Sequence, residues 1–138
     1  MNKVSLESVG GIQFSVLMSV YHRENPEHLE QSLRSLLKQT LQADEVVLVE
    51  DGPIGRELAS IIESYRAKLN IVSVRLTQHS GLAVALNEGL KQCAHDLVAR
   101  MDTDDFALPE RFEKQVSFMK ANPEIAISSC SIEEYDSR

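Results

Sequence analysis

Short, nearly continuous apolar runs alternate along this chain with longer segments of helical periodicity. An apolar run of strand length without alternation is expected for a parallel strand that is covered on both faces of its sheet. The repeated strand–helix order predicts an α/β fold: a mainly parallel sheet with helices on both faces and right-handed crossovers. The runs that predict strands are residues 14–18, 46–49, 71–76, 97–101 and 125–128.

The intervening segments carry apolar residues at helical spacing and have recognisable ends. Asn25 before Pro26 predicts an N-cap followed by proline at the first helical position. Ser80 is expected to cap the third helix, and Pro109 is expected to open the fourth. The apolar stripes that predict the four helices lie at residues 29–37, 58–69, 82–93 and 112–119.

The chain is long enough for one domain and contains no internal linker or repeat. Its 138 residues are 43% hydrophobic and 25% charged, as in ordinary globular proteins. We expect residues 1–11 to form a flexible arm and residues 12–138 to form one α/β unit. The 14 basic and 21 acidic residues give a net charge of −7. This charge disfavours nucleic acid as a partner, because nucleic-acid surfaces need clustered Lys and Arg.

Cysteine content and hydropathy point to a cytoplasmic protein. Cys93 and Cys130 are the two cysteines, without metal-ligand spacing, and both are expected to be reduced and largely buried. No apolar run approaches the length of a membrane span, and the N-terminus lacks the apolar core of a signal peptide. Peripheral contact with the inner face of the cell membrane, through regions outside this chain, stays open.

Three carboxylates follow the fourth predicted strand within four positions. They are Asp102, Asp104 and Asp105. Like charges this close together are unfavourable unless a cation offsets them. Carboxylates without Cys or His favour a hard ion, Mg²⁺ or Mn²⁺, over Zn²⁺. The alternative interpretation is an acidic loop that happens to follow a strand.

A second acidic position, Asp51, follows the second predicted strand, and Ser19 and Tyr21 follow the first. Ligands of open α/β sheets bind outside the carboxyl ends of the strands. If the second and fourth strands are neighbours, their acidic groups face one crevice. The alternative is that Asp51, followed by glycine and proline, only stabilises its own turn. Among the scattered histidines, only His79, in a loop after a strand, is a candidate worth testing.

At this point four segments resemble family 2 glycosyltransferases, the GT-A class that uses nucleotide-sugar donors. Each segment is a moderate match, but their order is the family's and they span nearly the whole chain. The resemblance implies a Rossmann-like GT-A half-domain that binds the donor. The matching segments are residues 14–21, residues 36–40 with 44–52, residues 80–89, and residues 100–105 with 109–111.

The resemblance also implies roles by position. Asp51 matches the residue that hydrogen-bonds the base, usually uracil, and Ser19 and Tyr21 lie where the first strand approaches that base. Asp102 matches the first acid of the Asp-x-Asp pair, near the ribose and the metal. Asp104 matches the second acid, which binds Mn²⁺ or Mg²⁺ on the donor diphosphate, and Asp105 is expected to ligate through water or to orient its neighbours.

Two departures from the family pattern limit which residue roles the resemblance implies for this chain. Leu86 stands where the family often has Arg before the Asn of the third segment. No residue matches the general base, an Asp or Glu that deprotonates the attacking hydroxyl, so we expect it beyond Arg138. The chain is therefore expected to be the donor-binding part of a longer enzyme.

The resemblance implies an inverting, metal-dependent transfer of a sugar from a UDP-sugar to a glycan or glycolipid acceptor, such as lipopolysaccharide or capsule. Two alternatives start from the same residues. A phosphotransferase of the haloacid-dehalogenase type also carries Asp-x-Asp at a strand end, but it needs a small hydroxyl or β-branched residue where Phe106 stands. A receiver-like binding module could use Glu50 and Asp51 as an acidic pocket, but no Lys ends the last predicted strand.

Overall fold

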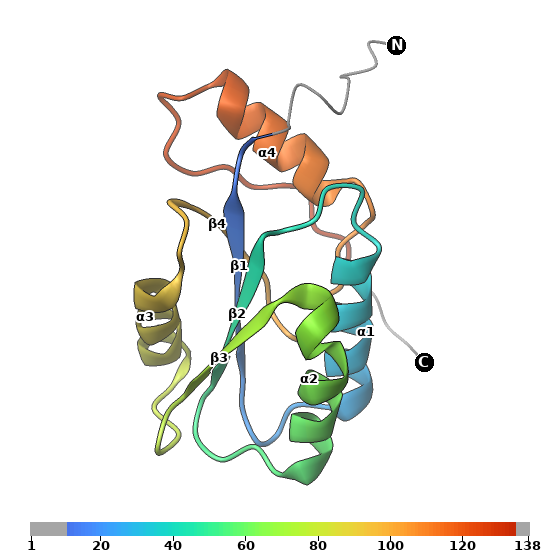
Figure 1. Cartoon of the computed structure of the whole chain (residues 1–138), viewed down its shortest axis with the longest axis vertical. Coiled ribbons are helices and arrows are strands. Elements are labelled where there is room, and N and C mark those ends of the chain that lie inside the picture. The colour runs from blue at the N-terminus through green and yellow to red at the C-terminus, as the bar shows by residue number, and fades with distance from the viewer. Residues whose placement is uncertain (1–10, 135–138) are drawn as a thin grey trace.

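The computed structural model describes residues 11–134, in which strands and helices alternate along the chain (Figure 1). Residues 1–10 lie outside the described part, so the predicted arm stays a prediction. The elements are β1 (Phe14–Val20), α1 (Pro26–Leu37), β2 (Glu45–Glu50), α2 (Arg56–Leu69), β3 (Ile71–Arg75), α3 (Leu82–Gln92), β4 (Leu97–Arg100) and α4 (Arg111–Ala121).

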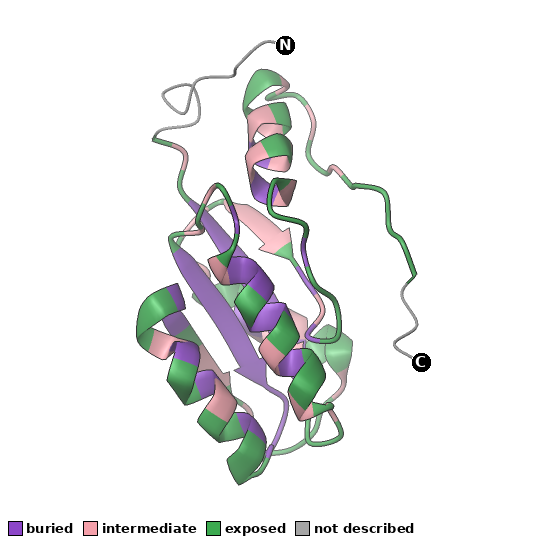
Figure 2. Ribbon diagram, turned by 90° about the vertical axis from the view of Figure 1, so that its right-hand side faces the viewer, coloured by how far each residue is buried: buried purple, intermediate pink, exposed green. Residues whose placement is uncertain are grey.

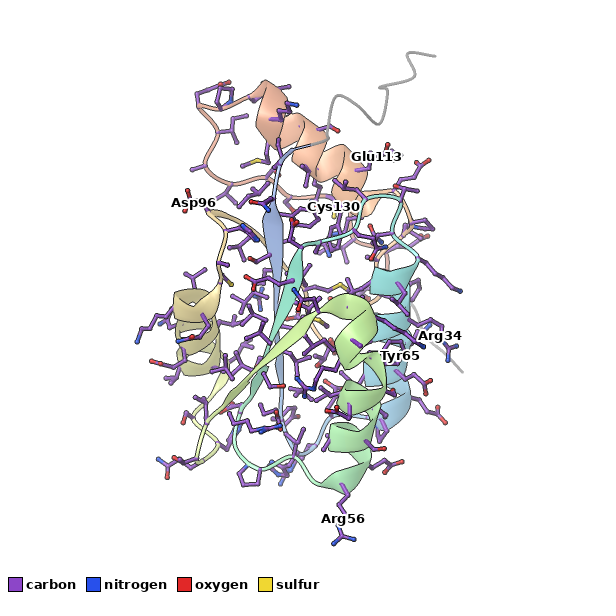
Figure 3. The ribbon with its side chains drawn as sticks, in the orientation of Figure 1. Arg34, Arg56, Tyr65, Asp96, Glu113 and Cys130 are labelled. Atoms are coloured by element: carbon purple, nitrogen blue, oxygen red, sulfur yellow. The ribbon has the colours of Figure 1, made fainter. Side chains whose placement is uncertain are left out.

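The strands form a parallel sheet in the order β3-β2-β1-β4. Helices α1 and α2 lie together on one face, and α3 lies alone on the other (Figure 1). Arg34 of α1 and Tyr65 of α2 lie next to each other where these helices meet (Figure 3). The expected α/β architecture with both faces covered is confirmed.

The two faces of the sheet have cores of very different size. Strands β1 and β2 are almost entirely buried at the centre (Figure 2). The larger core lies between the sheet and helices α1, α2 and α4, and includes Phe14, Leu33, Ile62 and Phe112. The smaller core under α3 has as its buried members Leu17, Val47, Val49 and Ala85.

The helix ends agree with the sequence only in part. Asn25 Oδ1 accepts a hydrogen bond from the Glu27 amide at 2.8 Å, so the predicted cap of α1 is confirmed. Ser80 does not cap α3: Gly81 is the N-cap residue, and the Ser80 hydroxyl donates to the Gln78 carbonyl. Helix α4 begins at Arg111, two residues after Pro109.

The predicted fifth strand, residues 125–128, is wrong. The structure assigns no strand there, and Ile127 is 86% exposed. An apolar run forms a strand only when another strand offers hydrogen bonds, and no strand of the described residues pairs with this run. Burial of Cys130 was inferred from that strand, so it is also wrong: Cys130 is exposed, whereas Cys93 is half-buried.

Candidate functional site

The carboxyl ends of β1, β2 and β4 lie at one edge of the sheet because all three strands run in the same direction. The condition that β2 and β4 are neighbouring strands is not met, because β1 lies between them. Val20 pairs with Glu50 in the β1–β2 ladder, and the Asp51 amide donates to the Val20 carbonyl at 2.8 Å. Parallel strands lie about 4.8 Å apart, so β2 and β4 are separated by about 10 Å across the sheet. β4 ends at Arg100, which pairs with Leu17, so the segment that follows it runs on alongside the end of β1.

Ser19 and Tyr21 reach this edge from β1. Ser19 lies inside β1, not after it, because the strand continues to Val20 beyond the apolar run that predicted its end. Tyr21 follows the strand directly and its side chain is partly exposed. β1 therefore places both residues between the two acidic positions.

The acidic loop after β4 brings three carboxylates together. Each of Asp102, Asp104 and Asp105 offers an oxygen within 4.8 Å of the others. Burial raises the pKa of Asp105, and the negative charges of Asp104 and Asp102 raise it further, against the opposing effect of Arg111 and Arg100. Mutual repulsion at this range and an oxygen-only donor set fit a hard divalent cation.

One arginine already contacts the cluster from its own strand. Arg100 Nη2 lies 3.1 Å from Asp102 Oδ1, and both side chains are about half exposed. An ion pair this exposed contributes little to stability. Arg111 donates to the Arg100 carbonyl at 3.0 Å, which ties the start of α4 to the end of β4. The cluster therefore faces solvent with part of its charge balanced.

Asp51 is buried, with 2% of its surface exposed, and its carboxylate is bound by a different loop. Its Oδ1 accepts from the Ser80 amide at 2.7 Å, and its Oδ2 accepts from the Gly81 amide at 3.1 Å. His79 Nδ1 lies 3.0 Å from the same Oδ2. Asp51 thus binds the N-terminus of α3, where a carboxylate is favoured by the unpaired amides and the helix dipole.

Gly52 permits this arrangement. Its φ of +85° lies in the left-handed region, and a Cβ built on it would lie 2.6 Å from the His79 backbone nitrogen. The loop that carries His79 therefore packs directly on the backbone after Asp51. From the sequence, these positions predict only a turn, and the pattern does not indicate which loop the Asp51 carboxylate binds.

Three rings gather beside Asp51. Tyr21 lies 5.6 Å from both His22 and His79, measured between ring centroids, and the two histidines lie 6.0 Å apart. These two histidines are far apart in the sequence. The fold brings them together because the segments that follow β1 and β3 meet beside the end of β2. His79, the one histidine singled out from the sequence, is in contact with Asp51, and His22 was missed.

A row of buried polar side chains on α1 and just past its end was also missed. Ser35 Oγ accepts from the Ala107 amide at 3.0 Å. Gln39 Nε2 donates to the Leu108 carbonyl at 2.8 Å, and its Oε1 accepts from the Phe112 amide at 3.1 Å. This row holds the segment that follows the acidic loop. The sequence signal for this row is the helical spacing of three polar residues among the leucines: Ser32, Ser35 and Gln39 lie at i, i+3 and i+7.

Hollows and helices elsewhere add no second site. One hollow lies on the outer side of α3 near Val84 and Leu90, and another lies between α4 and the start of β4 near Leu97 and Met119. Neither is lined by the acidic loop or by Asp51. Among the described residues, no helix has the length and apolar character that crossing a bilayer requires.

Comparisons with known proteins agree with one another. The family model for Glycosyl transferase family 2 matches residues 15–138. The amylovoran biosynthesis glycosyltransferase AmsE of Erwinia amylovora is 52% identical over 123 residues, which are 89% of this chain and 46% of that protein. The UDP-Gal:alpha-D-GlcNAc-diphosphoundecaprenol beta-1,3-galactosyltransferase of Escherichia coli is 44% identical over 124 residues, 90% of this chain and 45% of that protein.

A solved structure of S. aureus TarS 1–349 in complex with UDP-GlcNAc has a TM-score of 0.73 and 30% identity, covering 81% of this chain and 32% of that one. The structural neighbours have the GT-A fold, and enzymes with this fold generally depend on a divalent metal. The chain spans about half the length of the curated relatives it matches. These matches support neither the phosphotransferase nor the receiver-like alternative.

Proposed function

Because this chain belongs to glycosyltransferase family 2, we propose that it is the nucleotide-sugar-binding portion of a metal-dependent, inverting glycosyltransferase. The full enzyme transfers a sugar from a UDP-sugar to a surface glycan or glycolipid acceptor. The observation that carries the proposal is the meeting of the acidic loop, Asp51 and the β1 end at the carboxyl edge of one parallel sheet.

The donor base and ribose are assigned to the β1 and β2 ends. Tyr21 offers a partly exposed ring for stacking, and Ser19 lies on the strand beside it. Asp51 accepts two hydrogen bonds from backbone amides and has His79 Nδ1 beside it, and a carboxylate has about four lone-pair directions, so acceptor capacity is left for a base N–H. Asp102 is assigned to the ribose side of the metal position. The UDP-GlcNAc complex of TarS supports a UDP-sugar as the donor class.

The donor diphosphate is assigned to the acidic loop through a Mn²⁺ or Mg²⁺ ion. Asp102 and Asp104 hold the ion, and Asp105 binds it through water or orients its neighbours. When bound, the ion offsets the negative charge that develops on the departing nucleoside diphosphate. The general base is assigned to residues outside this chain, and the acceptor class rests on the names of the polysaccharide and lipid-linked relatives.

We also propose that the full enzyme works in the cytoplasm, with peripheral contact at the inner face of the cell membrane through regions outside this chain. This location is part of the proposal and is supported by the diphosphoundecaprenol-linked substrate in the name of one relative.

Calorimetric titration of UDP with and without Mn²⁺ tests the proposal. Mn²⁺ should tighten UDP binding by the wild-type chain, and Asp104→Asn should remove that gain because one ligand carboxylate is lost. Asp96→Asn is the matched control: it makes the same chemical change at an exposed acid on the α3–β4 loop (Figure 3). UDP binding that is indifferent to Mn²⁺ in the wild-type chain would count decisively against the proposal.

A further inference from the structure

Thr103, the residue between the first two acids of the loop, is turned into the protein. Only 3% of its surface is exposed, although both neighbours face solvent. Its Oγ1 lies 2.6 Å from Glu24 Oε2 and 3.2 Å from the Ser19 carbonyl oxygen. A hydroxyl has one proton, so the shorter contact identifies Glu24 as the main acceptor.

Glu24 is itself fixed by the turn between β1 and α1. Its backbone amide donates to the Tyr21 carbonyl at 3.1 Å, and its second carboxylate oxygen accepts from the Asn25 amide at 3.0 Å. Asn25 is the N-cap residue of α1. The Thr103 hydroxyl therefore anchors the acidic loop to a helix start that packing on the main core holds in place.

We propose that Glu24 and Thr103 form a positioning pair that holds the acidic loop in its cation-binding shape, an inference that rests on the proposed function. Three carboxylates repel one another when no cation is present, and repulsion favours a more open loop. An anchor between Asp102 and Asp104 opposes that opening, so less reorganisation is needed when a cation binds. Ser32 Oγ, 3.4 Å from the Asp102 carbonyl, supports the same backbone from α1.

The pair also links the two halves of the donor site. The turn that positions Glu24 carries Tyr21, and the loop that Thr103 anchors carries the acids. Neither residue of the pair is assigned a contact with the donor or the ion, so the expected effect is on affinity for the ion and not on recognition of the base.

The test measures Mn²⁺ binding to the full 138-residue chain by electron paramagnetic resonance of the free ion. Thr103→Val keeps the shape of the side chain and removes the hydroxyl, so Mn²⁺ affinity should fall about tenfold, as is typical when a partner behind the ligands is lost. Thr103→Ser keeps the hydroxyl and should restore most of the affinity. Glu24→Gln keeps an acceptor oxygen and should lose less than Glu24→Ala.

Thr40→Val is the matched control. Thr40 Oγ1 makes the same kind of bond, 2.8 Å from Glu113 Oε2 and 3.2 Å from the Pro109 carbonyl, at the start of α4 and away from the acids (Figure 3 labels Glu113). Its Mn²⁺ affinity should equal that of the wild type. An equal loss in Thr40→Val and Thr103→Val would overturn the inference, because general destabilisation would then explain both.

A double variant and metal-free UDP binding complete the test. Glu24→Ala combined with Thr103→Val should be no worse than either change alone, because both remove the same bond. UDP binding without metal should be unchanged in Thr103→Ser and Glu24→Gln. Unchanged Mn²⁺ affinity in Thr103→Val would overturn the positioning pair alone, whereas a wild-type chain that does not bind Mn²⁺ would overturn the proposed function with it.

Discussion

At the scale of single residues, Asp51 holds the start of a helix with the same carboxylate that we propose for recognition of the base. Asp51 follows β2 directly and is buried at the sheet edge, and the Ser80 and Gly81 amides occupy about half of its acceptor directions. An acid that only recognised the base of a nucleotide would not need hydrogen bonds from the Ser80 and Gly81 amides. We infer that holding the start of α3 is what gives Asp51 a fixed direction towards a donor.

Replacing Asp51 with Asn should therefore destabilise the fold as well as weaken UDP binding. The amide keeps one acceptor oxygen and turns an NH₂ group towards a backbone N–H donor. Leaving such a buried donor unsatisfied costs about 1–3 kcal/mol. Urea unfolding measures this loss. Ser80→Ala should leave the bond to Asp51 intact because the donor is the backbone amide, and equal stability of both variants would contradict the capping role.

The two cysteines should differ in reactivity. Burial raises the pKa of the Cys93 thiol, the nearby Glu45 charge raises it further, and a hydrogen bond with Ser15 acts in the opposite direction. A raised pKa leaves less thiolate at a given pH, and the thiolate is the nucleophile. Iodoacetamide at pH 8 should therefore alkylate exposed Cys130 well before half-buried Cys93. Peptide mass spectrometry follows both sites, and their rates should converge in urea; faster labelling of Cys93 in the folded chain would contradict this.

Local sequence patterns predicted the positions of the acids but not their partners. Asp102, Asp104 and Asp105 lie within four consecutive positions, so any strand end would bring them together. The partners of Asp51 come from 28 to 30 residues away along the chain, and Thr103 and Glu24 are separated by 79. Such pairs depend on strand order, which a single sequence with periodic segments does not specify.

At the scale of elements, α1 connects the acidic loop to the rest of the fold. Its leucines fill the main core, while Ser32 and Ser35, together with Gln39 just past the helix end, bind the backbone of residues 102–112. That segment is irregular, so its amides and carbonyls need side-chain partners where they are buried. A helix with one buried polar row among apolar residues supplies them.

Gln39→Ala should cost roughly 2–4 kcal/mol of unfolding free energy, since the Leu108 carbonyl and the Phe112 amide both lose a buried partner. Gln42→Ala is a matched control. Gln42 donates to three carbonyls at the end of α1, but it is exposed, and water can replace it at a cost of about 1 kcal/mol or less. Chemical denaturation of both variants gives the comparison; similar losses would contradict a special role for the α1 row.

The elements themselves were predictable where two independent signals agreed. Helix α1 had its apolar stripe and an Asn-Pro start, and it begins at Pro26 as expected. The run at 125–128 had hydropathy alone, and it forms no strand because an apolar run cannot show whether a neighbouring strand is available. Ser80 had the right residue type for a cap, but the Asp51 carboxylate already binds the α3 start, so Ser80 is not needed there.

At the scale of the whole molecule, the sheet is held unequally on its two faces. Helix α2 buries Leu58, Ile62, Tyr65 and Leu69 in the main core. Helix α3 buries only Ala85 and Gly89, and a Cβ on Gly89 would lie 2.5 Å from side-chain atoms of Leu17 and Val49. Close approach through glycine therefore replaces large apolar contacts on the α3 face.

Hydrogen exchange should reveal this difference as unequal local stability. Amides of α3 should exchange through local opening at a lower free energy than those of α2, because less apolar surface is exposed when α3 leaves the sheet. Pulse-labelling mass spectrometry at neutral pH compares peptides from the two helices, which have 11 and 14 residues. Asp51→Asn should speed exchange in α3 more than in α2, because the loss of the bonds at the N-terminus of α3 favours local opening of that helix beyond any change in global stability. If α3 instead exchanges only with global unfolding, at the same rate as α2, then the small core and the Asp51 cap are enough to make the two faces one cooperative unit.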